Sequence, residues 1–584
     1  MESDIKPIIE KIKDNPQELQ KFQETLQKSS TRKKSEILLQ FPTVYIHNWK
    51  NTKDYEIYIG ESMDMVKRTK EHYAASDKED AWQRLALSTD GSLYIIGHEH
   101  FNKSMTLDIE NRLMQYMMSV ELVRRVHNQK KNPQNRYYPD SETDVIFQKI
   151  WRKLRRDNKE LFPKESMIKD SAVFKASPLH KLTKEQKEIQ QLIIQNVQEA
   201  LQTGKRNQLI FIDGEAGTGK TVLNSSTFYE IYSIAEELKT DSLKCFLLVN
   251  HDEQLLVYEQ IAQKLGLTDQ YGKVVSKPTS FINHHFPKEP VDVVFVDEAH
   301  LLLTQGKQSY QGKNQLQDIL ERAKVTVVMF DENQILRAEQ YWEAQILAQY
   351  RELAKKQNHH FELTKQLRIR GLEEVMSWID EFTKQKKVSK LPINTGDYEI
   401  RIFEKPEEME RAVRKKASDK KHQLSRILAT YDWEYSSNSA PAAKMGKYWE
   451  VMIGRWHKPW NRELDKGLDR KTKRKNKTLA WAEQPQTIGE VGSTFTIQGF
   501  DLNYAGVILG PSVKYREGQI VFDPSASHNK RAVQNRTLTD GTKQSFGETL
   551  IQHEVRVLMT RGVEGLYIYA CDEELRKALL NAAK

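Results

Sequence analysis

Residues 214–221 form a loop whose composition suits the binding of phosphate groups. The loop fits the pattern G-x-x-x-x-G-K-[ST], follows an apolar strand-like run at 208–213 and precedes a helical stretch. Glycines let backbone N–H groups curl around phosphate oxygens, the lysine can reach the β and γ phosphates, and the threonine hydroxyl can ligate magnesium. The residues expected to bind a nucleotide here are Gly214, Gly217, Gly219, Lys220 and Thr221. A glycine-rich turn before a helix is the alternative interpretation.

An acidic pair follows a second apolar run downstream of this loop. Residues 293–296 have the pattern of a buried strand that ends in Asp297 and Glu298. In phosphoryl-transfer sites one carboxylate can hold Mg²⁺ while another orients and deprotonates the attacking water. We therefore predict that Asp297 is a magnesium ligand together with Thr221, and that Glu298 is catalytic.

A second set of reactive side chains lies in the first part of the chain. Tyr45 and Tyr58 fall on neighbouring strand-like segments, and Arg68 and His72 are four residues apart on one face of an expected helix. Glu110 falls in the apolar stripe of a later helix, where an acid is costly unless it is paired or bound to a metal. We therefore predict one divalent metal at Glu110. An ordinary α/β domain with a paired, buried glutamate is the alternative.

The composition is that of a long chain with a small basic excess. The chain has 584 residues, of which 38% are hydrophobic and 29% charged, and its net charge is +9. This length favours three or four domains, and the charge weakly favours a polyanionic partner such as nucleic acid. The two cysteines, Cys245 and Cys571, exclude a disulfide framework. Because we find neither a signal peptide nor an apolar run of membrane-spanning length, we expect a cytoplasmic protein without a membrane partner.

Alternating strand-like and helical segments place the phosphate loop in an α/β multidomain fold with parallel sheets. The expected strands are 208–213, 244–249, 291–296 and 325–330 in one set, and 398–403, 426–430, 505–509 and 566–570 in another. The expected segments are an N-terminal helical extension at 1–40, a small α/β domain at 41–140, a connector at 141–180, a first lobe at 181–358 and a second lobe at 359–584.

The second lobe carries an expected insertion, at about 432–485, that combines basic and aromatic residues. Lys and Arg side chains crowd between Lys466 and Lys477, and five tryptophans lie around them: Trp433, Trp449, Trp456, Trp460 and Trp481. Such residues can hold a phosphate backbone while bases stack on the rings. A solvated loop beside a partly buried aromatic cluster fits the same sequence equally well.

Further motifs follow the phosphate loop in a fixed order. They stand at 182–186, 248–251, 330–334, 366–368, 494–501 and 558–562, around the Asp-Glu-Ala-His sequence at 297–300. In this order they resemble a superfamily-one helicase-like P-loop ATPase of two RecA-like lobes. More narrowly, residues 180–584 resemble the bacterial family related to the helicase-like domain of Schlafen proteins. The resemblance implies ATP as the nucleotide and adds these site residues: Gln186 for the adenine, Gln334 as γ-phosphate sensor, and Arg368 and Arg561 as cations for the γ-phosphate.

Phosphoryl transfer needs positive charge around the γ-phosphate in the transition state. The first lobe supplies Lys220 and the second lobe supplies arginines, so we expect ATP to close the lobes and hydrolysis to open them. We find no large insertion of the kind that processive unwinding enzymes carry. Translocation, remodelling and ATP-gated sensing therefore stay open beside strand separation.

Residues 41–140 carry the motifs Thr43-Val44-Tyr45-Ile46 and Tyr58-Ile59-Gly60. They resemble the GIY-YIG endonuclease domain, although in the first motif Val44 precedes Tyr45 without the glycine. The resemblance implies that Tyr45 and Tyr58 act on the nucleophilic water and that Arg68 stabilises the phosphate. It further implies that His72 assists proton transfer and that Glu110 binds the metal, which is Mg²⁺ or alternatively Mn²⁺. It also implies a structural asparagine, for which we choose Asn128 over Asn132 and Asn135.

Together these patterns predict a GIY-YIG nuclease fused to a two-lobe ATP-dependent motor that binds DNA, with RNA as the alternative. A cutter and a motor on one chain suggest bacterial anti-phage defence by analogy. An enzyme of DNA repair or recombination and a nucleotide-gated nucleic-acid sensor or scaffold are the alternatives. A homo-oligomer or a partner defence protein also fits the sequence.

Overall fold

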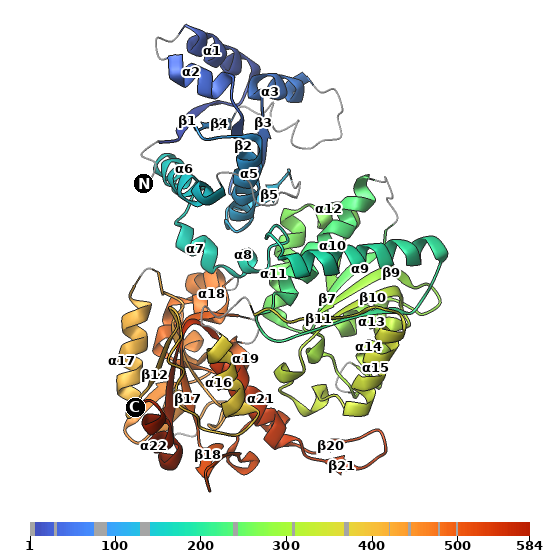
Figure 1. Cartoon of the computed structure of the whole chain (residues 1–584), viewed down its shortest axis with the longest axis vertical. Helices are drawn as coiled ribbons and strands as arrows, with labels where there is room; N and C mark the ends of the chain where they lie inside the picture. Colours follow the sequence, from blue (N-terminus) through green and yellow to red (C-terminus); the bar gives the residue numbers. More distant parts are fainter. Residues whose placement is uncertain are drawn as a thin grey trace. The chain divides into compact units, whose positions relative to one another are not determined.

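Three principal sheets carry the fold, one in each third of the chain (Figure 1). The computed structural model describes residues 6–584 apart from 29–31, 75–89, 129–139, 238–242, 307–309, 367–372, 420, 438, 442–445, 477–478 and 498–499. The chain divides into two compact units. One consists of Met1–Leu182 and Val257–Val275, and the other of Thr183–Leu256 and Ser276–Lys584.

The N-terminal sheet has the strand order β1-β4-β2-β3-β5. Its strands are β1 (Ile8–Lys13), β2 (Thr43–Lys50), β3 (Tyr55–Ser62), β4 (Gly91–Gly97) and β5 (Val123–Val126). The pairs β1–β4, β4–β2 and β2–β3 are antiparallel, whereas β3 and β5 are parallel. The neighbouring strands predicted around Tyr45 and Tyr58 are therefore confirmed as β2 and β3.

The segment at 1–40 is not wholly helical, which corrects the expected N-terminal helical extension. It contributes β1 as well as α1 (Pro16–Gln27) and α2 (Arg32–Leu39). Pairing with β1 satisfies the backbone groups along the outer edge of β4, which would otherwise be an open sheet edge. Ile8 and Ile12 of this strand pack against a buried cluster that includes Leu19 and Leu93. This segment is therefore part of the N-terminal domain.

The helix predicted around Glu110 is confirmed as α5 (Lys103–Met118), and α6 (Thr143–Asp157) follows it. The ring of Tyr116 on α5 lies 4.8 Å from Phe147 and 4.9 Å from Trp151, both on α6. The shorter α7 (Glu165–Asp170) and α8 (Ala172–Lys175) follow. The stretch expected to be a connector, 141–180, thus includes helices that pack against α5.

The first of the two larger sheets has the order β11-β6-β10-β9-β7-β8. Its strands are β6 (Gln208–Gly214), β7 (Cys245–Val249), β8 (Val275–Ser276), β9 (Val291–Asp297), β10 (Ala323–Phe330) and β11 (His360–Leu363). The pairs from β11 through β7 are all parallel. The connecting helices include α9 (Lys184–Thr203), α10 (Lys220–Glu237), α11 (Asp252–Lys264), α12 (Leu267–Tyr271), α13 (Pro278–His284), α14 (Gln315–Leu320) and α15 (Ala344–Lys356). The predicted first set of strands is confirmed.

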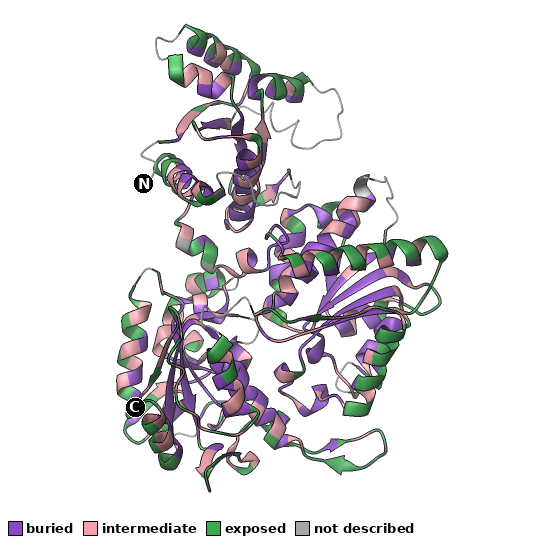
Figure 2. Cartoon of the chain, viewed as in Figure 1, coloured by how far each residue is buried: buried purple, intermediate pink, exposed green. Residues whose placement is uncertain are grey.

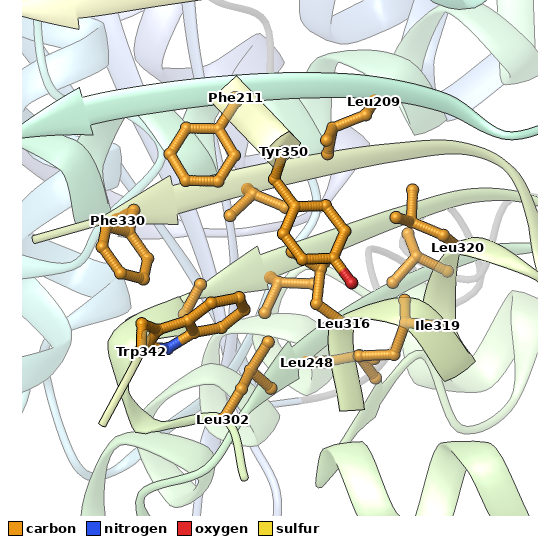
Figure 3. Packing of buried hydrophobic residues seen from close by; sticks show 14 of the residues in the cluster. Leu209, Phe211, Leu248, Leu302, Leu316, Ile319, Leu320, Phe330, Trp342 and Tyr350 are labelled. Carbon is orange, nitrogen blue, oxygen red and sulfur yellow. The ribbon is translucent and has the colours of Figure 1, made fainter. Parts of the chain in front are cut away.

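Aromatic and aliphatic side chains fill the space between this sheet and its helices (Figure 3). The ring of Phe330 at the end of β10 lies 5.5 Å from both Phe211 and Trp342, and Trp342 lies 5.8 Å from Tyr350 on α15. Strands covered on both faces read as continuous apolar runs, which is why their positions could be predicted. This packing fixes the strand ends at which the phosphate loop and the acidic pair stand.

The second larger sheet is also parallel, with the order β12-β22-β17-β13-β16. Its strands are β12 (Glu399–Ile402), β13 (Arg426–Ala429), β16 (Val491–Gly492), β17 (Leu502–Leu509) and β22 (Gly562–Ala570). Its helices include α16 (Glu373–Thr383), α17 (Pro406–Ala417), α19 (Thr494–Ile497), α20 (Lys530–Val533), α21 (Gly547–Met559) and α22 (Glu573–Ala582). The predicted second set of strands is confirmed. Small hairpins are added by β14 (Glu450–Ile453) with β15 (Trp456–Pro459), β18 (Val513–Arg516) with β19 (Gln519–Phe522), and β20 (Arg536–Thr537) with β21 (Lys543–Gln544).

The tryptophans of the expected insertion are mostly core residues rather than a stacking surface. Four of them are buried, namely Trp449, Trp456, Trp460 and Trp481. The basic residues of α18 (Arg470–Asn476) are instead exposed. The interpretation as a solvated basic segment beside a buried aromatic cluster therefore holds. Figure 2 shows the same contrast throughout the chain, with buried strands and exposed outer helix faces. Within the described ranges, no helix is both long and apolar enough to cross a bilayer.

Candidate functional sites

The predicted phosphate loop connects β6 to α10. Gly217 and Gly219 have φ angles of 89° and 82°, which glycine adopts without a steric penalty. The Lys220 ammonium donates to the carbonyl oxygens of Gly214 at 2.6 Å and Glu215 at 2.9 Å. The loop thus folds back over its own lysine and holds the ammonium at the centre of the backbone curve.

Gln186 lies against the same loop. It stands at the third position of α9, where it forms a capping box with Thr183. Its side-chain amide donates to the carbonyl oxygens of Thr218 at 3.2 Å and Gly219 at 3.4 Å. The structure therefore gives Gln186 a role in holding the loop, and its contact with adenine stays a prediction.

The acidic pair stands at the end of β9. Asp297 accepts a hydrogen bond from the Gln254 amide at 2.8 Å, and Glu298 has a left-handed backbone with φ of 48°. The buried His300 ring nitrogen lies 3.5 Å from the Glu298 carboxylate, and burial lowers the pKa of His300. Carboxylate and hydroxyl oxygens are the ligands that Mg²⁺ prefers, so Asp297 and Thr221 have suitable chemistry for the predicted metal.

A chain of polar contacts runs from the phosphate loop into the second lobe. Lys220 lies 3.5 Å from the Asp331 carboxylate, which accepts a hydrogen bond from the Gln334 amide at 2.8 Å. Gln334 in turn accepts from Arg561 at 3.1 Å. Burial would raise the pKa of Asp331, but the Lys220 charge and its other partners hold that pKa below its ordinary value. The predicted sensor glutamine therefore joins the two lobes directly.

Arg561, predicted as the arginine finger, is fully buried. Besides Gln334, its guanidinium donates to the carbonyl oxygens of Val557 at 3.0 Å and Phe500 at 3.3 Å. Arg368 lies outside the described residues. Its neighbour Gln366 donates to the Ala216 carbonyl of the phosphate loop at 2.6 Å. Arg561 thus contacts Gln334 of the first lobe, and the closure of the lobes by ATP stays a prediction.

The sequence did not single out Arg556, which also reaches the phosphate loop. It lies on α21, five residues before Arg561, and donates to the Glu215 carboxylate at 2.6 Å. It also donates to Asp380 on α16 at 2.9 Å. The pKa of Arg556 would fall through burial, but Asp380 and Glu215 raise it. Arg556 lies outside the motif at 558–562, so no local pattern indicated this contact.

A cavity of about 660 Å³ combines cationic and aromatic side chains. The Arg337 guanidinium lies over the Phe495 ring at 4.9 Å, and Phe495 lies 5.3 Å from Tyr431. Burial and the nearby Arg531 lower the pKa of Arg337 to about 10, which leaves it charged at neutral pH. Arg462 and Lys530 also line the cavity. Arginines and aromatic rings in one groove have the chemistry that binds a nucleic-acid strand.

The predicted tyrosine pair lies on adjacent strands of the N-terminal sheet. The rings of Tyr45 on β2 and Tyr58 on β3 have centroids 6.2 Å apart. A β-carbon added at Gly60 would lie 2.5 Å from the Tyr45 hydroxyl, so only glycine leaves room for this ring. Tyr58 lies 5.3 Å from His72 on α3 (Met65–Ala74). The structure thus brings these predicted residues together.

Glu110 and Asn128 form the other side of this cluster. The Asn128 amide donates to Glu110 at 2.9 Å and to the Ile59 carbonyl of the second motif at 2.6 Å. The rival asparagines, Asn132 and Asn135, lie outside the described residues. The Glu110 carboxylate is a hard oxygen ligand, and Mg²⁺ commonly uses one or two such groups with waters. The side chain therefore suits the predicted metal, although it contributes a single carboxylate.

The electrostatics of this cluster favour neutral side chains. Burial and Tyr58 raise the pKa of Tyr45, and burial followed by the Glu110 charge raises that of Tyr58. Burial, Arg68 and His47 lower the pKa of His72 to about 4. Neutral tyrosines can position a water, whereas a neutral histidine can accept its proton. Arg68 itself is half-exposed on α3 and ion-paired with Glu71 at 3.4 Å.

Behind these residues lies a buried pair that the sequence did not reveal. His47 on β2 pairs with Asp14 at 2.9 Å, and the Tyr73 hydroxyl donates to the same carboxylate at 2.6 Å. His47 stands opposite Tyr58 in the strand register and 6.5 Å from the His72 ring. Asp14 follows β1, so the strand absent from the prediction brings this carboxylate beneath the cluster.

Comparison with known families matches residues 207–572 to the description "Schlafen group 3, DNA/RNA helicase domain". The uncharacterized protein YPL245W of Saccharomyces cerevisiae is 33% identical over 413 residues, covering 65% of this chain and 85% of that protein.

Two solved structures resemble the chain weakly. One is described as the structural basis for DNA unwinding at forked dsDNA by two coordinating Pif1 helicases. It is 13% identical, covers 69% of this chain and 96% of that one, and has a TM-score of 0.27. The Pif1 helicase from Candida albicans is also 13% identical, covers 41% and 55%, and has a TM-score of 0.20.

Proposed function

We propose, since the chain belongs to the Schlafen group 3 DNA/RNA helicase family, that its helicase-like ATPase lobes use ATP with Mg²⁺ to bind and remodel a nucleic-acid strand. The observation that carries this proposal is the chain of contacts from Lys220 through Asp331 and Gln334 to Arg561. It links the phosphate loop of the first lobe to Arg561, the cation expected from the second lobe. Such a link lets the state of the nucleotide alter the contact between lobes.

Each residue of the ATP site has a distinct proposed part. Lys220 neutralises phosphate charge, Thr221 and Asp297 hold Mg²⁺, and Glu298 orients and deprotonates the attacking water. Bound Mg²⁺ supplies charge neutralisation at the phosphate oxygens. The neutral, buried His300 beside Glu298 leaves that carboxylate available as a base, because it adds no competing positive charge.

The cavity around Arg337 is the proposed strand site. Arg337 follows Gln334 by three residues, so one short segment connects the ATP site to the cavity. Arg531 and Lys530 would bind phosphates while Phe495 and Tyr431 offer ring faces to bases. DNA is the proposed substrate and RNA the alternative, since neither charge nor stacking distinguishes the two.

The cluster around Tyr45 supports a second activity, metal-dependent phosphodiester cutting of the GIY-YIG type. Tyr45 and Tyr58 would position the water, and neutral His72 would accept its proton. Arg68 would stabilise the charge on the phosphate, and Glu110, held by Asn128, would bind Mg²⁺ or Mn²⁺. The contact of Asn128 with both Glu110 and the second motif supports this proposal.

One experiment tests both activities. The purified chain is incubated with single-stranded DNA, duplex DNA or RNA, with Mg²⁺ or Mn²⁺, and with or without ATP. Lys220→Ala should abolish nucleic-acid-stimulated ATP hydrolysis, whereas Glu110→Gln should abolish cutting and leave hydrolysis unchanged. Hydrolysis that persists in the first variant contradicts the ATPase assignment, and cutting that persists in the second contradicts the nuclease assignment.

The biological role remains our prediction of anti-phage defence, with DNA repair and nucleic-acid sensing as alternatives. Plaque counts with and without the gene in a bacterial host test defence directly. The yeast relative is 85% covered by this chain, so the family extends to a eukaryote. Since a yeast protein does not meet phage, this relative favours the alternative roles in the handling of cellular nucleic acid.

A further inference from the structure

Glu215 places a negative charge within the phosphate loop, where the ligand itself is strongly anionic. Its carboxylate is half-exposed and accepts from Arg556 at 2.6 Å through one oxygen. The other oxygen accepts from Lys384 at 2.9 Å and from the Asn333 amide at 3.3 Å. Two cations of the second lobe are therefore held at the loop by a carboxylate of the first.

The two cations are also fixed from their own lobe. Asp380 on α16 accepts from Arg556 Nε at 2.9 Å and from Lys384 at 2.9 Å. Asp380 thus anchors the Arg556 guanidinium through Nε, while Nη2 donates to Glu215 in the phosphate loop. A guanidinium oriented from behind and open toward a phosphate loop has the geometry with which arginine binds phosphate oxygens.

The contact with Glu215 carries a consequence for the nucleotide. A γ-phosphate near this loop and the Glu215 carboxylate would offer the same kind of acceptor to one guanidinium, and like charges so close repel each other. Binding of a triphosphate is therefore favoured when Glu215 releases Arg556. A diphosphate brings no γ-phosphate and gains nothing from that exchange.

We propose that Glu215 is a carboxylate latch that occupies Arg556 and Lys384 until the γ-phosphate of ATP replaces it, so that Arg556 is a second phosphate-contacting cation beside Arg561. This inference rests on the proposed ATPase function and adds to it a mechanism for distinguishing ATP from ADP. Asp380 keeps Arg556 in place during the exchange. Glu215 then moves into solvent, which its half-exposed side chain allows.

The test compares the affinities of the full chain for Mg²⁺–ATPγS and Mg²⁺–ADP, measured by competition with a fluorescent nucleotide. In Glu215→Gln, which keeps the shape and removes the charge, affinity for ATPγS should rise about tenfold while that for ADP changes by less than about twofold. Such a gain corresponds to a latch that is engaged in roughly nine molecules of ten. In Arg556→Gln, affinity for ATPγS should fall about tenfold with little change for ADP.

Two further variants separate the latch from a merely structural bridge between lobes. The double variant E215Q/R556Q should bind ATPγS as weakly as R556Q alone, and Arg556→Lys should restore part of the preference for ATPγS. Parallel changes for both nucleotides, or an unchanged ratio in E215Q, would overturn the latch and leave the ATPase assignment standing. Absence of binding of either nucleotide by the unmodified chain would instead overturn the proposed ATPase function and the latch with it.

Discussion

Arg536 is a second-lobe arginine that is buried against the first lobe, and its removal should loosen a defined local contact. Its guanidinium donates to Thr304 Oγ1 at 2.7 Å and to the carbonyl oxygens of Ala338 at 2.9 Å and Tyr341 at 2.5 Å. It is 2% exposed and lies 3.7 Å from Glu343. Arg536→Met retains most of the volume of the side chain but removes every donor.

The expected magnitude follows from these partners. Hydrogen bonds from a charged donor contribute roughly 1.5–3 kcal/mol each, and they are not additive because one group serves several acceptors. Breaking a buried pair by removing one partner costs about 3–5 kcal/mol. We therefore expect the free energy of local opening of this contact to fall by about 3–5 kcal/mol. Arg536→Lys should recover only part of this loss, since an ammonium cannot reproduce the planar fork.

Native-state hydrogen exchange measures this quantity directly. Amides in peptides that cover 338–343 and 536–544 should exchange faster in the methionine variant. The matched control is Arg516→Met, because Arg516 is half-exposed and pairs with Asp572 at 2.9 Å. Because exposed ion pairs contribute little, that change should leave the exchange of these peptides unaltered. Protection in Arg536→Met within about 0.5 kcal/mol of the unmodified chain would refute the assignment of Arg536 as an interlobe anchor.

Gly60→Ala should lower cutting about a hundredfold and leave ATP hydrolysis unchanged, because the added carbon would lie 2.5 Å from the Tyr45 hydroxyl and displace it; equal cutting would show that this ring is not positioned for catalysis. Because the pKa of His72 falls from 6.5 to about 4 on folding, the unfolded chain binds more protons between these values. The free energy of unfolding of the N-terminal domain should therefore fall by up to roughly 3 kcal/mol as pH drops from about 6.5 to 4, in thermal unfolding series. His72→Gln should flatten this pH dependence, and an unaltered pH profile in the variant would show that His72 is not its source. Arg531→Gln should weaken nucleic-acid binding and reduce its salt slope by about 1, whereas Arg516→Gln should do neither; an unchanged slope in titrations would exclude Arg531 from the strand site.

The strands and the phosphate loop could be predicted because their signals are local. A strand buried on both faces is mostly apolar, as in β9 and β10, and it can be recognised within one short window. The loop needs glycines at Gly217 and Gly219, whose positive φ angles are a requirement of the backbone itself. The asparagine at Asn128 was likewise chosen by its place in a motif, and its contact with Glu110 adds geometric support.

The residues that escaped prediction act through partners that are distant in sequence. Arg556 meets Glu215 across 341 residues, and Arg536 meets Thr304 across 232. The type of an arginine and of its neighbours does not show whether it faces solvent or another lobe, so no local pattern identifies either contact. The strand β1 was missed for a related reason, since its pairing depends on the open edge of β4. The tryptophans of the insertion show that aromatic composition alone does not distinguish a core from a surface.

The contacts between the lobes change how the proposed ATP cycle must work. A cycle of lobe closure would have ATP bring Arg561 to the phosphate loop. In the structure Arg561 meets Gln334, Arg556 meets Glu215, and Arg536 is buried against the first lobe. We therefore expect ATP binding to exchange partners within this interface. Gln334 and Arg337 belong to one short segment. A change of partner at Gln334 is therefore expected to shift the Arg337 guanidinium in the strand site. Coupling of ATP to a bound strand then requires only a local rearrangement.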